Sequence, residues 1–337
     1  MRRYLVKRAG QAVLVLWAAY TLSFVLLSAL PGDAVRNRIA NPESNITPEA
    51  AKTLLDWYKL DRPLWWQYLH GLGGVLTGRF GFSLTSGSSV QELIADALPS
   101  TLRLTLLGLG LGIVFSTVVA GLITYGPWGW LRELASAVPS LWASVPTFVV
   151  GIVALQYLSF RAHLIPSVDD GTFVALLAPA ATLAFVIAAP LSQTLAASIR
   201  STRGQPFVHV LQAKGAGEGY IFRKDVFRNS SLPALTLLGI AFGELIASAV
   251  VTETVYARKG IGQLVVGAVS TQDLPVVQGV VLLSTAVYVC VNLLVDIAYP
   301  FIDPRILVDG RTQRVTRGRA ARAAVPAARA PAEVSVP

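Results

Sequence analysis

Long apolar runs without charge recur along this chain, and they constrain its fold more than any other feature. Five runs of at least 20 residues contain no Asp, Glu, Lys or Arg, and a sixth contains a single acid, Glu244. An α-helix needs about 20 apolar residues to cross the hydrocarbon core of a bilayer. The sequence therefore predicts an all-α, polytopic membrane protein with six transmembrane helices. The runs are Gln11–Leu30, Leu104–Tyr125, Leu134–Phe160, Gly171–Ile199, Ser230–Thr252 and Leu274–Val295.

Composition leads to the same class of protein. Hydrophobic residues make up 53% of the chain, charged residues only 14%, and the mean hydropathy is +0.58. These values exclude an ordinary soluble domain. The first apolar run follows a basic N-terminus, but it is longer than the apolar region of a cleaved signal peptide, so we expect it to be retained as a span.

Lysine and arginine predict the orientation of the chain. With six spans both termini lie on one side, and 18 of the 28 Lys and Arg residues fall on that side. Because cytoplasmic loops are enriched in these residues, we expect both termini in the cytoplasm and the chain in the inner membrane of a bacterium. The net charge of +9 is then a property of the cytoplasmic face and does not indicate nucleic-acid binding.

We expect the chain to have four parts. Residues 1–30 are the cytoplasmic N-terminus and the first span, and residues 31–98 are an external helical segment. Residues 99–306 are a transmembrane domain of five helices, which includes a cytoplasmic loop at 200–231. Residues 307–337 consist mainly of Arg, Ala, Pro and Val without apolar periodicity, which predicts a disordered basic tail.

The external segment contains three helix signals. A capping threonine, Thr47, opens a helix to about Leu60. Pro63 precedes a second helix that is rich in aromatic residues, which suit a membrane–water interface. Ser89 begins a capping box, which predicts a third short helix as far as Pro99. We interpret the segment as a small cap on which a delivering partner docks, or as interfacial packing alone.

Prolines and one acid within the spans are candidates for a translocation path. Pro139 and Pro146 are predicted to interrupt the third span, and Pro179 and Pro190 the fourth, because each removes a backbone hydrogen bond. Broken helices in membranes usually face protein or a water-filled path. Glu244 is a functional candidate, because burying a charge in the bilayer is energetically unfavourable and the ionisable residues found there usually have a function. The alternatives are structural kinks with no path beside them, and a protonated carboxyl packed against a neighbouring helix.

The connection at 200–231 is longer than two adjacent spans require. Pro206 suits the first turn of a short helix, and Gly215 suits a left-handed end. Phe207, Val208 and Leu211 give this helix an apolar face. A basic helix then resumes toward the next span. A short surface helix with an exposed apolar face fits a groove in a partner protein. The alternative is an ordinary positively charged loop.

Short segments along most of the chain occur in an order typical of one family. Over residues 1–306 the sequence resembles the permease subunits of binding-protein-dependent ABC importers, in the dipeptide, oligopeptide and nickel branch. The resemblance implies the type I ABC importer permease fold. The segments are Leu30-Pro31-Gly32-Asp33, Leu60-Asp61-Arg62-Pro63-Leu64, Gly81-Phe82-Ser83-Leu84, Leu98-Pro99-Ser100-Thr101, Ser144-Val145-Pro146-Thr147-Phe148, Ala213-Lys214-Gly215, Arg228-Asn229, Leu232-Pro233, Glu253-Thr254-Val255-Tyr256, Gly260-Ile261-Gly262, Pro275-Val276-Val277-Gln278-Gly279 and Asp303-Pro304-Arg305.

The resemblance also implies which residues meet the ATPase. In that family the cytoplasmic loop is the coupling helix, which docks into an ATPase subunit, and its glycine aligns with Gly215. The family's general coupling motif opens with Glu-Ala-Ala, and the corresponding residues here are His209-Val210-Leu211. The peptide branch often lacks that glutamate too, so the difference weakens the match to the general motif more than the assignment to the branch. The implied coupling residues are Phe207, Val208, Leu211, Ala213, Lys214, Gly215, Glu218, Arg223 and Arg228.

Partners and cofactors follow from the same resemblance. The implied partners are a second homologous permease, two ATPase subunits, an extracytoplasmic peptide-binding protein and membrane lipids. No cofactor is expected in this chain, since it contains no Gly-x4-Gly-Lys-Ser/Thr segment and ATP and Mg would be bound by the ATPase subunits. The implied substrates are short peptides, with nickel complexes or other small solutes as the alternative.

Two other classes are weighed against a transport subunit. An intramembrane enzyme needs a Ser–His, paired-Asp or metal-ligand set in the spans, but His70, His163 and His209 lie in connections and far apart in sequence. A channel would have no use for a long cytoplasmic coupling loop, and no ring-forming filter segment is visible. The sequence therefore favours a non-catalytic transport subunit.

Overall fold

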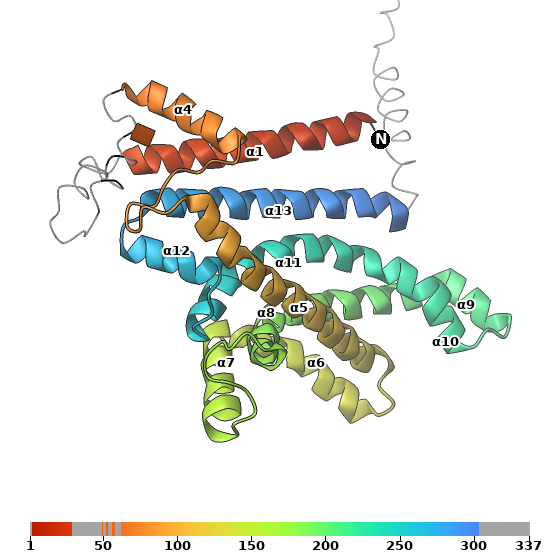
Figure 1. The fold of residues 1–337 in the computed structure, drawn as a ribbon. Helices are drawn as coiled ribbons and strands as arrows, with labels where there is room; N and C mark the ends of the chain where they lie inside the picture. The colour runs from red at the N-terminus through yellow and green to blue at the C-terminus, as the bar shows by residue number, and fades with distance from the viewer. Residues whose placement is uncertain (1, 29–48, 50–51, 53–55, 58–61, 303–337) are drawn as a thin grey trace, which may run out of the picture. The chain divides into compact units, whose positions relative to one another are not determined.

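A computed structural model describes residues 2–28, 49, 52, 56–57 and 62–302, and Figure 1 shows their arrangement. The predicted all-α fold is confirmed, since the described residues contain no β-strand beyond an isolated bridge between Phe82 and Ser89. The α-helices are α1 (Arg2–Ser28), α4 (Leu64–Leu76), α5 (Val90–Tyr125), α6 (Gly129–Ser144), α7 (Thr147–Ala154), α8 (Phe173–Arg203), α9 (Pro206–Ala213), α10 (Glu218–Ile221), α11 (Phe227–Val255), α12 (Ile261–Ser270) and α13 (Leu274–Ile302). π-Helical turns follow α7 at Leu155–Arg161 and α10 at Phe222–Val226.

The chain divides into two compact units, Met1–Leu293 and Leu294–Pro337. Within the second unit only the last turns of α13 are described. The basic tail predicted at 307–337 lies outside the described residues. All contacts below belong to the first unit.

Five helices among the described residues are long and apolar enough to cross a membrane, and a bent pair raises the number to six if it is one span. The bend lies between Gly129–Ser144 and Thr147–Arg161, whose axes differ by 99°. Val145 is extended at this break and Pro146 follows it, as expected because the residue before a proline is disfavoured in the helical region. The number of six spans therefore remains a prediction.

The predicted interruptions at three other prolines are wrong. Pro139 lies inside α6, and Pro179 and Pro190 lie inside α8, which is continuous over 31 residues. A proline removes one hydrogen bond and crowds the preceding turn. In α8 the helix survives this loss because most of its length is packed against α5, α6, α7 and α11, so its residues have little freedom to leave the helix.

The external segment follows the sequence prediction only in part. The second helix is confirmed as α4, and the Ser89 hydroxyl accepts a hydrogen bond from the Glu92 amide at 3.4 Å, as a capping residue should. The helix that Ser89 opens does not end at Pro99, however. It continues to Tyr125 as α5, so the boundary drawn at residue 98 falls inside a helix. Most of the helix predicted from Thr47 lies outside the described residues.

Small residues allow α5 and α8 to approach closely. Leu183 and Ile187 of α8 are fully buried, and with Leu104 of α5 and Leu245 of α11 they form one apolar cluster. A Cβ atom added at Gly108 of α5 would lie only 2.9 Å from the Leu183 Cβ. Without a hydrophobic driving force between helices in lipid, such close packing is a main source of helix association.

Gly108→Ala should therefore destabilise the protein, whereas Gly110→Ala, two residues along the same helix, should not. The first change crowds a Cβ against α8, which costs about 1–3 kcal/mol when a packed core is overfilled. Nothing lies within 4 Å of a Cβ at Gly110, so there alanine gains only its better helix propensity. Thermal unfolding in a mild detergent measures both. Equal midpoints for the two variants would show that the α5–α8 contact is looser than described.

Candidate functional site

The short helix α9 has the ends that the sequence predicts. Gln205 is extended, Pro206 is the first helical residue, and Gly215 has the left-handed φ of +80°. The Ala216 amide donates to the Leu211 carbonyl at 3.1 Å, and the Gly215 amide donates to the Gln212 carbonyl at 2.9 Å. This pair of hydrogen bonds is the Schellman motif. The motif requires a residue in the left-handed backbone conformation, which glycine adopts without strain.

The apolar face predicted for α9 is divided between two sides of the helix, which corrects the sequence interpretation. Val208 is only 3% exposed and belongs to the chain's own core with Ile199 and Ile221, while Leu211 packs against that core. Phe207 points elsewhere, with 37% exposure, and Val210 is 52% exposed. The apolar surface available to a partner is therefore made by Phe207 and Val210, hereafter the α9 outer face.

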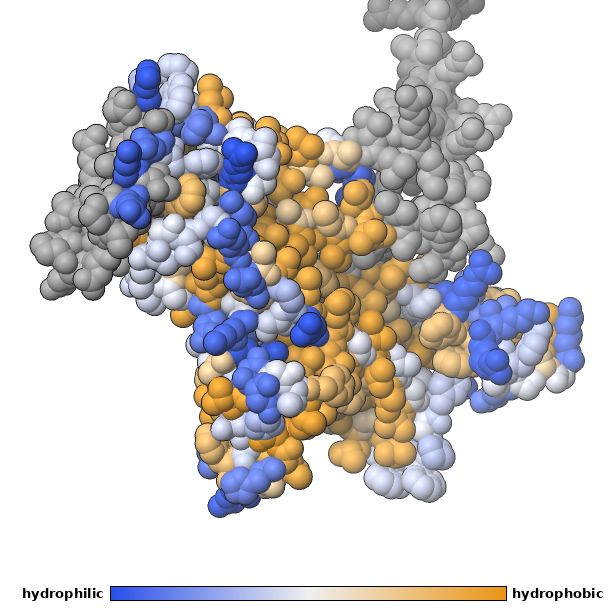
Figure 2. Space-filling view, viewed as in Figure 1, coloured by the Kyte–Doolittle hydropathy of each residue, from blue (hydrophilic) through white to orange (hydrophobic). Residues whose placement is uncertain are grey.

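The other predicted coupling residues lie at the surface of the chain. Ala213, Lys214, Glu218, Arg223 and Arg228 are all exposed. Figure 1 shows α9 and α10 together beyond the ends of α8 and α11, and Figure 2 shows hydrophilic side chains gathered over them. The loop thus exposes both apolar and polar side chains, as protein–protein contact surfaces do.

Sequence reasoning missed one residue that joins this loop to another helix. Arg203, the last residue of α8, donates from Nη1 to the Thr124 carbonyl at 3.0 Å and lies over the Tyr125 ring, 4.5 Å from its centroid. Its Nη2 is 3.7 Å from Oε1 of Glu218. The signal was weak because Arg203 is one of several basic residues in the loop and its partners on α5 are about eighty positions away in sequence.

The five candidates for the translocation path differ in their exposure. Pro139 and Pro179 are buried and Pro190 is half-buried, whereas Pro146 and Glu244 are exposed. None of them is among the residues that line the cavity described next. Their assignment to a path therefore remains a prediction.

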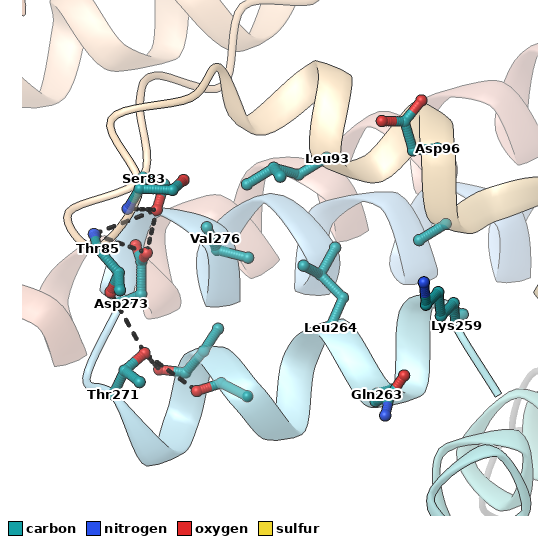
Figure 3. A pocket seen from close by; sticks show the side chains of 15 residues that line it. Ser83, Thr85, Leu93, Asp96, Lys259, Gln263, Leu264, Thr271, Asp273 and Val276 are labelled. Carbon is teal, nitrogen blue, oxygen red and sulfur yellow. Dashed lines mark hydrogen bonds between the residues drawn. The ribbon is translucent and has the colours of Figure 1, made fainter. Parts of the chain in front are cut away.

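A cavity lies near the start of α5, and Figure 3 shows it from close by. We call it the α12 cavity, because α12 supplies most of one wall. It has a volume of about 520 Å³, a mainly apolar lining, and Asp96 and Lys259 among its charged residues. Its lining residues are Ser83, Thr85, Ser86, Leu93, Asp96, Ala97, Lys259, Gly260, Gln263, Leu264, Gly267, Ala268, Thr271, Asp273 and Val276.

A buried aspartate holds one wall of the α12 cavity. Asp273 is 3% exposed and accepts a hydrogen bond from the Ser83 hydroxyl. Its carboxylate also accepts from the Leu84 amide at 3.0 Å and from the Thr85 amide at 3.2 Å. A carboxylate with several donors is a charge-assisted anchor, so this residue fixes the loop before α5 against the start of α13.

A second buried acid fixes α12 itself. Glu253 is fully buried near the end of α11, and it accepts from the Gly262 amide at 2.7 Å and from the Thr101 hydroxyl at 2.6 Å. Thr101 in turn accepts from the Ile261 amide at 2.8 Å. A carboxylate at the start of a helix satisfies amides that have no partner in the helix. Glu253 therefore joins α5, α11 and α12.

An ion pair adds to this joint. Arg258 is 6% exposed, and its Nη1 lies 3.0 Å from Oδ1 of Asp169, in the connection before α8. Its Nη2 donates to the Ser100 hydroxyl at 3.4 Å. Polar contacts therefore join α5, α11, α12 and the connection before α8, in addition to apolar packing.

These features define a polytopic helical membrane protein with a helical loop that exposes apolar side chains. The chain belongs to the family described as binding-protein-dependent transport system inner membrane components, since residues 108–308 match that family and residues 1–105 match its N-terminal region. Family and structure together make it a multi-pass inner-membrane transport component.

Curated relatives match along nearly their whole length. A probable peptide ABC transporter permease, y4tP of Sinorhizobium fredii, is 30% identical over 90% of this chain and 98% of its own. The glutathione permease GsiC of Escherichia coli and the dipeptide permease DppB of Lactococcus lactis are each 30% identical, over 91% of this chain and 99% of theirs.

A solved structure shares the fold. A chain of the MetNI methionine ABC transporter, in an inward-facing conformation, aligns with 62% of this chain and 96% of its own, at a TM-score of 0.53 and 17% identity. The predicted importer permease fold is therefore confirmed over that part of the chain.

Proposed function

We propose that this chain is a non-catalytic permease subunit of an ATP-driven importer of short peptides, and that it forms half of the translocation pathway. One observation carries the proposal: a loop between two spans is built into the helices α9 and α10 and presents the uncovered α9 outer face. The names of the relatives support the substrate class, because dipeptides and the tripeptide glutathione are short peptides.

The partners of the proposed complex follow from the surfaces that the chain leaves exposed. Large apolar side chains of α6, such as Trp130, Leu134 and Leu141, are more than half exposed, and they suit lipid or a second permease. The α9 outer face suits an ATPase subunit, of which a complete transporter would have two. An extracytoplasmic binding protein would deliver the peptide. In this arrangement six spans place both termini in the cytoplasm, and ATP and Mg are bound only by the ATPase subunits.

Reconstitution tests the proposal. The chain is co-purified with its second permease, ATPase and binding protein, placed in liposomes, and supplied with a labelled dipeptide. We expect uptake that requires both ATP and this chain. Uptake without ATP would indicate a channel, and uptake of a nickel complex in place of dipeptide would assign the other solute class of the branch.

A further inference from the structure

From the end of α8, Arg203 contacts three residues on two other helices, α5 and α10. Its guanidinium bonds the Thr124 carbonyl, stacks over Tyr125, and faces the Glu218 carboxylate. The Tyr125 ring also meets the ring of Phe222 edge-on, with centroids 5.1 Å apart. The last residues of α5 are therefore held by side chains at both ends of the α9–α10 loop.

The chemistry of this contact is specific to arginine. The Thr124 carbonyl lies in the last turn of α5, where carbonyls have no partner within the helix and the helix dipole favours a cation. A planar guanidinium donates hydrogen bonds along its edge while its face stacks on an aromatic ring. A lysine ammonium keeps the charge but cannot satisfy both geometries.

α5 has no direct chain connection to the α9–α10 loop, because it continues through Gly126 into α6. It is nevertheless one uninterrupted helix, and its other end lines the α12 cavity with Leu93, Asp96 and Ala97. Asp96 and Thr124 are 28 positions apart, which corresponds to about 42 Å along the axis. A single helix thus joins the loop contact to the cavity.

We propose that Arg203 is a positioning residue that transmits movement of the α9–α10 loop to α5, and through α5 to the α12 cavity. The proposal rests on the proposed function, since only an ATPase on the α9 outer face would move the loop. The test therefore measures the coupling between ATP hydrolysis and import directly.

The test uses the complete reconstituted transporter with Arg203→Lys. We expect at least tenfold fewer peptides imported per ATP hydrolysed, while the ATPase subunits co-purify at the wild-type level. Arg200→Lys, at an exposed position one turn earlier in α8 and outside the predicted coupling residues, is the matched control and should leave the ratio unchanged. Tyr125→Phe keeps the ring and should retain coupling, whereas Tyr125→Leu should lose it as Arg203→Lys does.

The double variant Arg203→Lys with Tyr125→Leu decides whether both residues act through one contact. Residues of one network are non-additive, so the double variant should couple no worse than the poorer single variant. Multiplied defects, a wild-type ratio in Arg203→Lys, or loss of the ATPase subunits from that variant would each overturn the proposal. If wild-type transporter shows no ATP-driven uptake, the proposed function fails, and this inference with it.

Discussion

A Phe207→Asp, Val210→Asp variant is expected to lose ATP-driven uptake completely while remaining folded in the membrane. Both side chains are exposed in the chain, so the charges are solvated until the partner docks. In an occupied groove each carboxylate would be buried without a partner, at a penalty of several kcal/mol. Purified complexes should show loss of the ATPase subunits together with loss of labelled dipeptide uptake.

Two neighbouring positions are the controls for this prediction. Val208→Ala removes two buried methyl groups on the opposite side of α9 and should reduce stability by about 2 kcal/mol without releasing the ATPase. His209→Ala changes an exposed residue outside the α9 outer face and should be neutral. If the double aspartate variant retains its ATPase and its uptake, the α9 outer face is not the contact surface.

Gly262→Ala is expected to prevent stable folding, which makes it the largest structural effect predicted for a single methyl group. A Cβ at this position would overlap the Cα of Val250 and crowd Oε2 of Glu253 at 2.8 Å. The Val250 backbone cannot rotate away as a side chain can, so α11 and α12 would have to move apart. We expect this to lower the free energy of unfolding by about 3 kcal/mol or more.

The matched control lies in the same helix. Gly267→Ala adds the same methyl group to α12 where nothing lies within 4 Å. Membrane protein level and thermal unfolding in detergent should separate the two variants clearly. Equal stability would mean that the α11–α12 joint is not as close as described, and it would also weaken the role given to Glu253.

Local chemistry was enough to predict the ends of α9, but not its orientation. A proline at the first turn and a left-handed glycine depend only on neighbouring residues. Which side of α9 packs against the core depends on the rest of the fold, because apolar residues at 207, 208, 210 and 211 cover much of the circumference of the helix. Val208 turns inward since Ile199 and Ile221 form the core there, and both lie outside the helix.

The prolines and Arg203 show the same limit. A proline is expected to end a helix when only local hydrogen bonds are counted, yet Pro99, Pro179 and Pro190 lie within helices that the surrounding packing maintains. The role of Arg203 depends on α5 ending beside α8, a contact between residues far apart in sequence. Glu253 and the segment Gly260-Ile261-Gly262 could be recognised in the sequence. The hydrogen bond between Glu253 and the Gly262 amide could not be predicted from it.

The most direct test of the coupling role is site-specific photocrosslinking from α9 in the assembled transporter. A photoreactive amino acid at position 210 should form an adduct with an ATPase subunit, and the same group at position 208 should react only within the chain. This coupling role would be contradicted by an intact complex in which position 210 gives no ATPase adduct, or in which it labels the binding protein instead.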